Sequence, residues 1–146
     1  MFQFSKPASV LINGPSQAGK SSFSRKLVHE RRDLLDPCDF DNILWFSPLE
    51  AIDPLPDVKY YKEVPDLEVL PSNSLIVIDD SLTELLNTPA FTNLVVKDTH
   101  HKNLFIIYIS HNLFAPSKYG RTAAINFNYI VLFPNSRDRL TISNLG

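Results

Sequence analysis

The chain has 146 residues, enough for one domain with a buried core, and 44% of them are hydrophobic. Its formal net charge is −2, and its single cysteine, Cys38, excludes an internal disulfide and fits a reducing compartment. The apolar runs are too short to span a bilayer, and the first residues lack the apolar core of a signal peptide. These features favour a single intracellular globular domain over residues 1–146, without a membrane span.

The first predicted elements are buried strands. They are Val10–Asn13, Ile43–Phe46, Leu75–Asp79, Leu104–Ser110 and Tyr129–Phe133, with a weaker extended segment at Val58–Lys62. Four of the five are near-continuous apolar runs, a pattern typical of parallel strands covered on both faces.

Helical patterns lie between the strands. One is predicted over Lys20–Leu34, and a second over about Leu82–Lys97, interrupted at Pro89 and therefore in two pieces. The proline-rich, acidic stretch Ser47–Ser74 is interpreted as an irregular surface excursion. Strands that alternate with helices predict an α/β domain.

A phosphate-binding loop follows the first predicted strand. The sequence Gly-Pro-Ser-Gln-Ala-Gly-Lys-Ser is a complete Walker A motif, and it leads into a helical pattern, the context that such a loop requires. The predicted nucleotide-binding residues are Gly14, Pro15, Ser16, Gln17, Ala18, Gly19, Lys20, Ser21 and Ser22. The alternative is a glycine-containing turn without function.

The residue types of this loop suit ATP with Mg²⁺. Gly14 and Gly19 allow backbone N–H groups to approach the phosphates, and the start of the helix directs its positive dipole end at them. Lys20 is expected to reach the β- and γ-phosphates, and Ser21 to bind Mg²⁺.

The third predicted strand ends in two acids, in the form of a Walker B motif. Asp79 is the candidate Mg²⁺ ligand, and Asp80 is the candidate base that orients the attacking water. The alternative is that two acids simply end a strand before a turn.

The following strand also ends in polar residues. His111 and Asn112 are candidates for a sensor that hydrogen-bonds the γ-phosphate or the attacking water; a capping role at the strand end is the alternative. The neighbouring pair His100 and His101 is not a predicted metal site, because adjacent side chains diverge and a third ligand at suitable spacing is missing.

Three arginines could be donated across a subunit interface to a neighbour's γ-phosphate. Arg121 is the first candidate, followed by Arg137 and Arg139; the alternative is a surface guanidinium paired with a carboxylate such as Asp138. Residues 91–146 carry six Lys or Arg and two Asp, and this basic part could face nucleic acid, or its charges could lie in loops beside buried strands.

With these residues assembled, the chain resembles the viral genome-packaging ATPases of the FtsK/HerA superfamily, in the poxvirus-type branch found also in Polinton/Maverick-like elements. Four segments match in order: Gly14–Ser22, Leu75–Ser81, Thr99–Phe114 and Arg121–Asp138.

The resemblance implies a P-loop NTPase of three-layer α/β/α architecture that hydrolyses ATP with Mg²⁺ and forms a homo-oligomeric ring. It implies that the ring moves double-stranded DNA into a capsid at its portal vertex, at an intracellular virion assembly site. It also implies that Lys20 and Ser21 bind nucleotide, that Asp79 and Asp80 form Walker B, that His111 and Asn112 are the sensor and that Arg121 is the arginine finger.

Two departures from the family pattern bear on function. His111 stands where the family usually has glutamine, and the sequence ends at Gly146, before further elements of relatives. Two alternatives stay open. One is a P-loop kinase of a nucleotide or another small molecule, because the loop is also close to the guanylate-kinase style, although Ser47–Ser74 contains no clear Arg-rich lid. The other is a truncated nucleotide-binding module without turnover. An ABC-type ATPase is disfavoured because the chain has no Leu-Ser-Gly-Gly-Gln-like signature.

Overall fold

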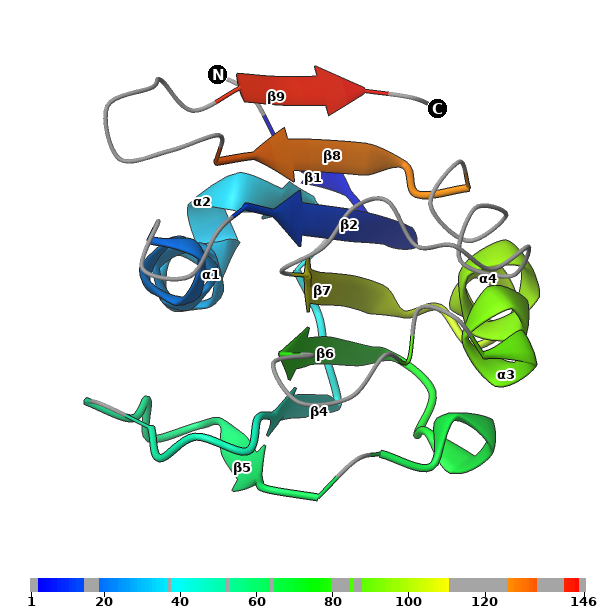
Figure 1. Cartoon of the computed structure of the whole chain (residues 1–146), viewed down its shortest axis with the longest axis horizontal. Helices are drawn as coiled ribbons and strands as arrows, with labels where there is room; N and C mark the ends of the chain where they lie inside the picture. Colours follow the sequence, from blue (N-terminus) through cyan, green and yellow to red (C-terminus); the bar gives the residue numbers. More distant parts are fainter. Residues whose placement is uncertain are drawn as a thin grey trace.

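A mostly parallel sheet forms the centre of the molecule. The computed structural model describes residues 3–14, 19–36, 38–51, 53–63, 65–79, 85, 88–110, 126–133 and 141–144, the last four as backbone only. Seven strands lie in the order β5-β4-β6-β7-β2-β8-β9 (Figure 1). They are β2 (Ala8–Asn13), β4 (Asn42–Phe46), β5 (Lys59–Tyr61), β6 (Ser74–Asp79), β7 (Phe105–Ser110), β8 (Tyr129–Leu132) and β9 (Thr141–Asn144).

All neighbouring strands of this sheet are parallel except β8 and β9, which pair antiparallel at one edge. The prediction of a mostly parallel sheet is therefore confirmed. The five strands predicted from apolar runs, and the weaker sixth at β5, are all present with ends within two residues of the predicted ones. The polar strand β9 has no apolar run, and the sequence did not predict it.

The helix after the first strand is shorter than predicted. Helix α1 covers Lys20–His29, and the single turn α2 follows at Arg31–Leu34. The break is at Glu30, where φ −100° and ψ 25° leave the helical range while its N–H still donates to the Lys26 carbonyl at 2.9 Å. The predicted continuous helix over Lys20–Leu34 is therefore wrong at this residue.

Of the second predicted helical region, Leu85 is described as part of a 3-10 helix, and residues 80–84, 86 and 87 lie outside the described part of the chain. The segment that begins at Pro89 agrees with the predicted interruption at this residue. It consists of α3 (Pro89–Asn93), the π-helical turn η3 (Leu94–Asp98) and α4 (Thr99–His101), so the predicted end at Lys97 is four residues too early. The Thr88 hydroxyl accepts the Phe91 N–H at 3.2 Å and caps the helix, and proline is well suited to a first helical position. Within the described part of the chain, no helix combines the length and apolarity needed to cross a bilayer.

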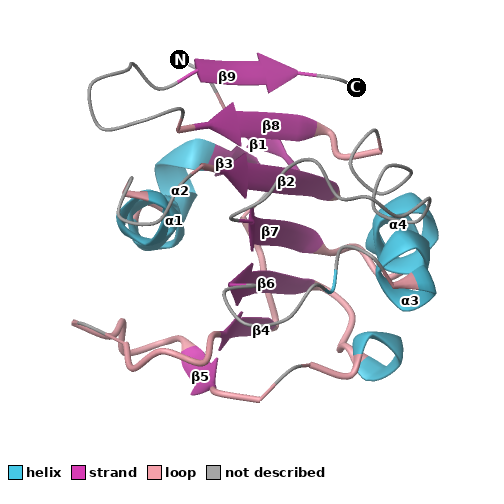
Figure 2. Cartoon of the chain, viewed as in Figure 1, coloured by secondary structure: helices cyan, strands magenta, loops and turns pink. Residues whose placement is uncertain are grey.

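Helices cover both faces of the sheet, which gives three layers (Figure 2). Alternate side chains of one strand enter different cores, because neighbouring residues of a strand point to opposite faces. In β2, Val10 packs in the core that contains Leu27 of α1, whereas Leu11 packs in the core that contains Phe91 of α3. This arrangement explains why the central strands are apolar at nearly every position.

The stretch Ser47–Ser74 is more ordered than the interpretation as an irregular excursion implied. It contains β5 and the short 3-10 helix η1 (Leu67–Val69). Leu55 and Val58 are buried in the core beside α1, and Leu67 is buried in the opposite core. The stretch therefore extends the sheet and both cores as well as forming surface.

A separate two-stranded parallel sheet joins β1 (Phe4–Ser5) to β3 (Leu35–Asp36). Both strands are too short to show a periodic pattern, so the sequence did not predict them. Between them Lys6 is buried, and its amine donates to the Asp39 carbonyl at 2.7 Å. This lysine is satisfied within the fold and therefore has a structural role.

Candidate nucleotide-binding site

Three strands bring the predicted site residues to one edge of the sheet. In the parallel register, Asn13 at the end of β2 pairs with Ser110 at the end of β7, and Ile109 pairs with Asp79 at the end of β6. Strand β7 therefore lies between the strand that precedes the phosphate loop and the Walker B strand. The carboxyl edge of a parallel sheet is where ligands of α/β proteins bind, so this placement fits a nucleotide site.

Both glycines of the phosphate loop are required by the structure, for different reasons. A Cβ atom on Gly14 would lie 2.7 Å from Cβ of Phe133 and closer still to the Phe133 carbonyl oxygen, a severe overlap. Gly19 has φ +90°, which side-chain-bearing residues rarely adopt, whereas a Cβ there would meet only Cε2 of Phe133 at 3.6 Å. Gly14 is thus needed because a side chain there would overlap Phe133, and Gly19 is needed because its backbone is in the left-handed region.

Gly19 is the N-cap residue of α1 and has no side chain that could cap this helix end. Because the first N–H groups of a helix have no acceptor within it, they are donors for an anion. Ser21 and Ser22 lie in this first turn and are exposed.

Lys20 is buried at the start of α1, with 3% of its surface exposed. Its amine donates to the carbonyl of Gly14 and, at 3.4 Å, to that of Ser110. Burial lowers the pKa of Lys20, and the negative charge of Asp79 partly opposes this shift. The amine therefore lies between the phosphate loop and the end of β7, with the Walker B carboxylate close enough to affect it.

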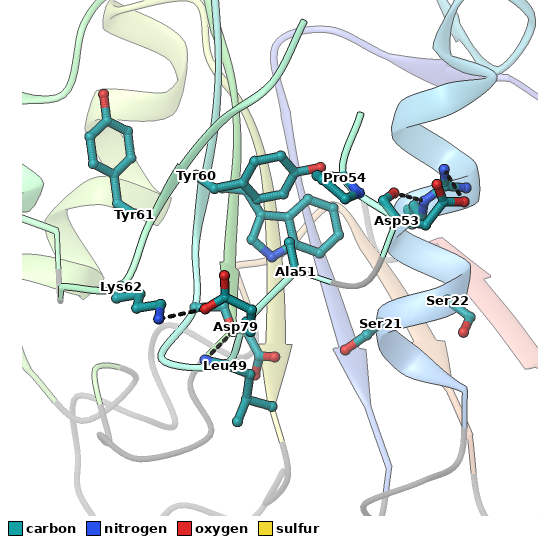
Figure 3. A pocket seen from close by; sticks show the side chains of 14 residues that line it. Ser21, Ser22, Leu49, Ala51, Asp53, Pro54, Tyr60, Tyr61, Lys62 and Asp79 are labelled. Atoms are coloured by element: carbon teal, nitrogen blue, oxygen red, sulfur yellow. Dashed lines mark hydrogen bonds and ion pairs between the residues drawn. The ribbon is translucent and has the colours of Figure 1, made fainter. Parts of the chain in front are cut away.

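The predicted Mg²⁺ ligands lie around one cavity. Ser21 from α1 and the buried Asp79 from β6 both line a cavity of about 610 Å³ (Figure 3). A hydroxyl and a carboxylate are the oxygen donors that Mg²⁺ prefers when it also binds phosphate. The donor set of these two residues therefore fits the metal that the sequence implied.

The described residues bring together Gly14, Gly19, Lys20, Ser21, Ser22 and Asp79 of the predicted site. The remaining predicted residues lie outside the described part of the chain: Pro15, Ser16, Gln17, Ala18, Asp80, His111, Asn112 and Arg121, together with Arg137 and Arg139. Among residues that are described, no group of three or more His, Cys, Asp or Glu is arranged to hold a metal ion.

Two residues of this site were not singled out from the sequence. Phe133 contacts Gly14, and its ring packs edge-on against Phe23 of α1 with centroids 5.8 Å apart. The buried Oδ1 atom of Asn13 has no hydrogen-bond partner among the described residues and is an acceptor directly before the phosphate loop. The signal for Asn13 was its position, as the polar residue between an apolar strand and the first glycine.

Comparisons with known proteins agree with the fold. No protein family model matches the chain, and no curated protein is similar to it. Among solved structures, the chain is similar to the genome packaging NTPase B204 from Sulfolobus turreted icosahedral virus 2 in complex with ATP-gammaS. The TM-score is 0.54 at 12% identity, over 86% of this chain and 74% of that chain.

The same NTPase in complex with sulfate gives a TM-score of 0.53 at 13% identity, over 90% of this chain and 76% of that one. At this identity the likeness concerns the fold. Together with the parallel sheet, the two covering layers and the glycine loop between β2 and α1, it identifies the architecture. The chain has the α/β fold of a P-loop NTPase.

Proposed function

We propose that the chain is an ATP-hydrolysing motor subunit that moves double-stranded DNA during virus assembly. The observation that carries the proposal is the meeting of Lys20, Ser21 and Asp79 at the carboxyl edge of the sheet, around β7. Two elements far apart in the sequence thereby supply the phosphate-binding and metal-binding groups of one site. The similarity to a genome packaging NTPase supports the motor class over other users of this fold.

In this proposal Lys20 neutralises charge on the β- and γ-phosphates, while Ser21 and Asp79 hold Mg²⁺. Asp80 orients the attacking water, and His111 or Asn112 senses the γ-phosphate. Arg121 of a neighbouring subunit in a homo-oligomeric ring offsets the charge that develops in the transition state. The ring acts at a capsid vertex at the intracellular assembly site.

The test is ATP hydrolysis by the purified chain, with and without double-stranded DNA at stated low salt. We expect turnover that DNA stimulates and that Lys20→Ala abolishes. The matched control is Lys26→Ala, because Lys26 is an exposed lysine of the same helix and should leave turnover unchanged. Asp80→Asn should keep nucleotide binding and lose turnover.

Two other outcomes would replace the proposal, and a third would change only the role of Arg121. Nucleotide binding without turnover, with or without DNA, would indicate a binding module that lacks a partner. Transfer of phosphate to a small acceptor instead of water would indicate a kinase. To test the ring, Arg121→Ala and Lys20→Ala proteins are mixed and ATP hydrolysis is measured. A mixture that never regains hydrolysis would mean that Arg121 does not act on the nucleotide of a neighbouring subunit.

A further inference from the structure

The cavity that Ser21 and Asp79 share extends well beyond the space needed for a metal ion. It continues from the first turn of α1 to the chain between β4 and β5, where Leu49 and Ala51 line it, and to Tyr60 of β5 (Figure 3). Trp45 of β4 also lines it. Its volume of about 610 Å³ is within the roughly 300–1,000 Å³ range of small-molecule sites. Ser21, Ser22 and Asp79 line the end of the cavity where the phosphates are expected, and the remainder is lined mainly by residues of β4, β5 and the chain between them.

An aromatic wall forms the far side. Trp45 of β4 is 8% exposed, and its ring lies 5.9 Å from that of Tyr60 of β5, with 35° between the planes. The Tyr60 hydroxyl accepts the Leu55 N–H at 2.8 Å, which fixes the orientation of this ring. The next tyrosine, Tyr61, is stacked on Phe46 instead and is directed away from Tyr60 (Figure 3). Flat aromatic faces favour a ligand with a planar ring.

Four of the five charged residues described in the cavity lining form two pairs. Arg25 of α1 donates to the Asp53 carboxylate at 3.0 Å and to its backbone carbonyl at 2.9 Å, and Lys62 pairs with Glu50 at 2.5 Å. These two pairs cancel in charge, and the remaining acid, Asp79, is at the phosphate end. Among the described residues near the aromatic wall, the lining therefore carries no excess charge, which favours an uncharged molecule.

We propose that this cavity is a second ligand site, which binds an uncharged planar heteroaromatic molecule of nucleoside size. The ring of the ligand lies against Trp45 and Tyr60, and its hydroxyl groups face Ser21, Ser22 and the Asp79 end. The inference rests on the proposed function in one respect: with ATP on the phosphate loop, the second ligand is next to the γ-phosphate.

The chain contains its own reporter for this site, because Trp45 is its only tryptophan. The experiment titrates adenosine, guanosine, cytidine and thymidine into the protein while Trp45 fluorescence is recorded. It is done with and without a saturating non-hydrolysable ATP analogue and Mg²⁺, whose own binding is measured separately by calorimetry. We expect a saturable fluorescence change with at least one nucleoside while the analogue stays bound.

Three variants locate the response. Tyr60→Ala removes half of the wall and should weaken nucleoside binding at least tenfold, whereas Tyr60→Phe keeps the ring, though not its hydrogen bond to Leu55, and should restore most of the affinity. Ala51→Phe adds a side chain at an exposed position of the lining, so it blocks the cavity without removing a buried contact. It should abolish the nucleoside response while analogue binding persists.

Two results would overturn the inference. One is the absence of any nucleoside response by fluorescence and calorimetry in protein that binds the ATP analogue. The other is a change in Trp45 fluorescence that occurs on raising the protein concentration alone and that prevents nucleosides from binding. That result would mean that a second copy of the chain fills the cavity. If the analogue fails to bind while the nucleoside response and its loss in Tyr60→Ala remain, the second site stands and the proposed ATPase function fails.

Discussion

The backbone of Phe133, directly after β8, occupies the space that a side chain on Gly14 would need. The contact joins Gly14, at the start of the phosphate loop, to the residue after β8, which lies far away in the sequence. Because Gly14 has no Cβ, its backbone can lie close against the residue that follows β8. This closeness and the left-handed conformation at Gly19 lead to distinct expectations for the two glycines.

Gly14→Ala should be the more damaging substitution of the two. Its Cβ would overlap backbone atoms, which cannot rotate away, and forced overpacking typically costs about 1–3 kcal/mol. Gly19→Ala meets no close atom but must adopt φ +90°, at a cost of about 1–2 kcal/mol. Denaturant unfolding and ATP titration of both variants test this. A Gly14→Ala protein with wild-type nucleotide affinity would show that the contact is not needed for binding.

Phe133→Ala should weaken ATP binding more than its loss of stability explains. Removing a ring that packs on Phe23 should lower the free energy of unfolding by about 2 kcal/mol, and should also loosen the loop at both glycines. The matched control is Phe40→Ala, a half-buried phenylalanine of the same core that packs at Lys6. Equal ATP affinity in the two variants would argue against a positioning role for Phe133.

ATP binding should take up a proton at alkaline pH. Burial lowers the pKa of Lys20, whereas added phosphate charge favours its protonated form, so affinity should fall as pH rises through the lowered pKa. Between the lowered pKa of the folded chain and the ordinary lysine pKa, the unfolded chain binds this proton and the folded chain does not. In that pH range the contribution of Lys20 to the stability of the fold therefore rises with pH. Calorimetry in two buffers of different ionisation enthalpy measures the uptake. Binding heats that do not depend on the buffer at any alkaline pH would contradict the prediction.

Asp79→Asn should shift that proton uptake to lower pH. The Asp79 charge raises the pKa of Lys20, so its removal leaves the effect of burial unopposed. The same variant should lose Mg²⁺-dependent hydrolysis, because an amide is a weaker Mg²⁺ ligand than a carboxylate. Asp41→Asn, at an exposed position before β4, is the control and should change neither property. An unchanged pH profile in Asp79→Asn would mean that the two residues do not interact in solution.

Several parts of this structure follow from the sequence because they depend on local patterns. The buried parallel strands were predictable because both faces are covered, so β6 and β7 read as apolar runs. That Asp79 and Lys20 lie near one another could be expected from the rule that parallel strands share a carboxyl edge.

Other features depend on contacts between distant segments. The burial of Leu55 and Val58 could not be predicted from a proline-rich stretch, because it depends on the partners that the fold provides. The same holds for Phe133, because its contacts with Gly14 and Phe23 join segments that are far apart in the sequence. By contrast, the interruption at Pro89 was predictable, because proline suits the first position of a helix and Thr88 caps the helix that begins there.

The central position of β7 has a consequence for how the chain folds. The strand that leads into the phosphate loop has β7 and β8 as neighbours, and Ala8 pairs with Phe105, 97 positions later. Contacts between such distant segments form slowly, since the loop between them must be closed first. During synthesis, the glycine loop therefore emerges long before the strands that shape it. We expect nucleotide binding to appear only at the end of folding, as the last property that the growing chain acquires.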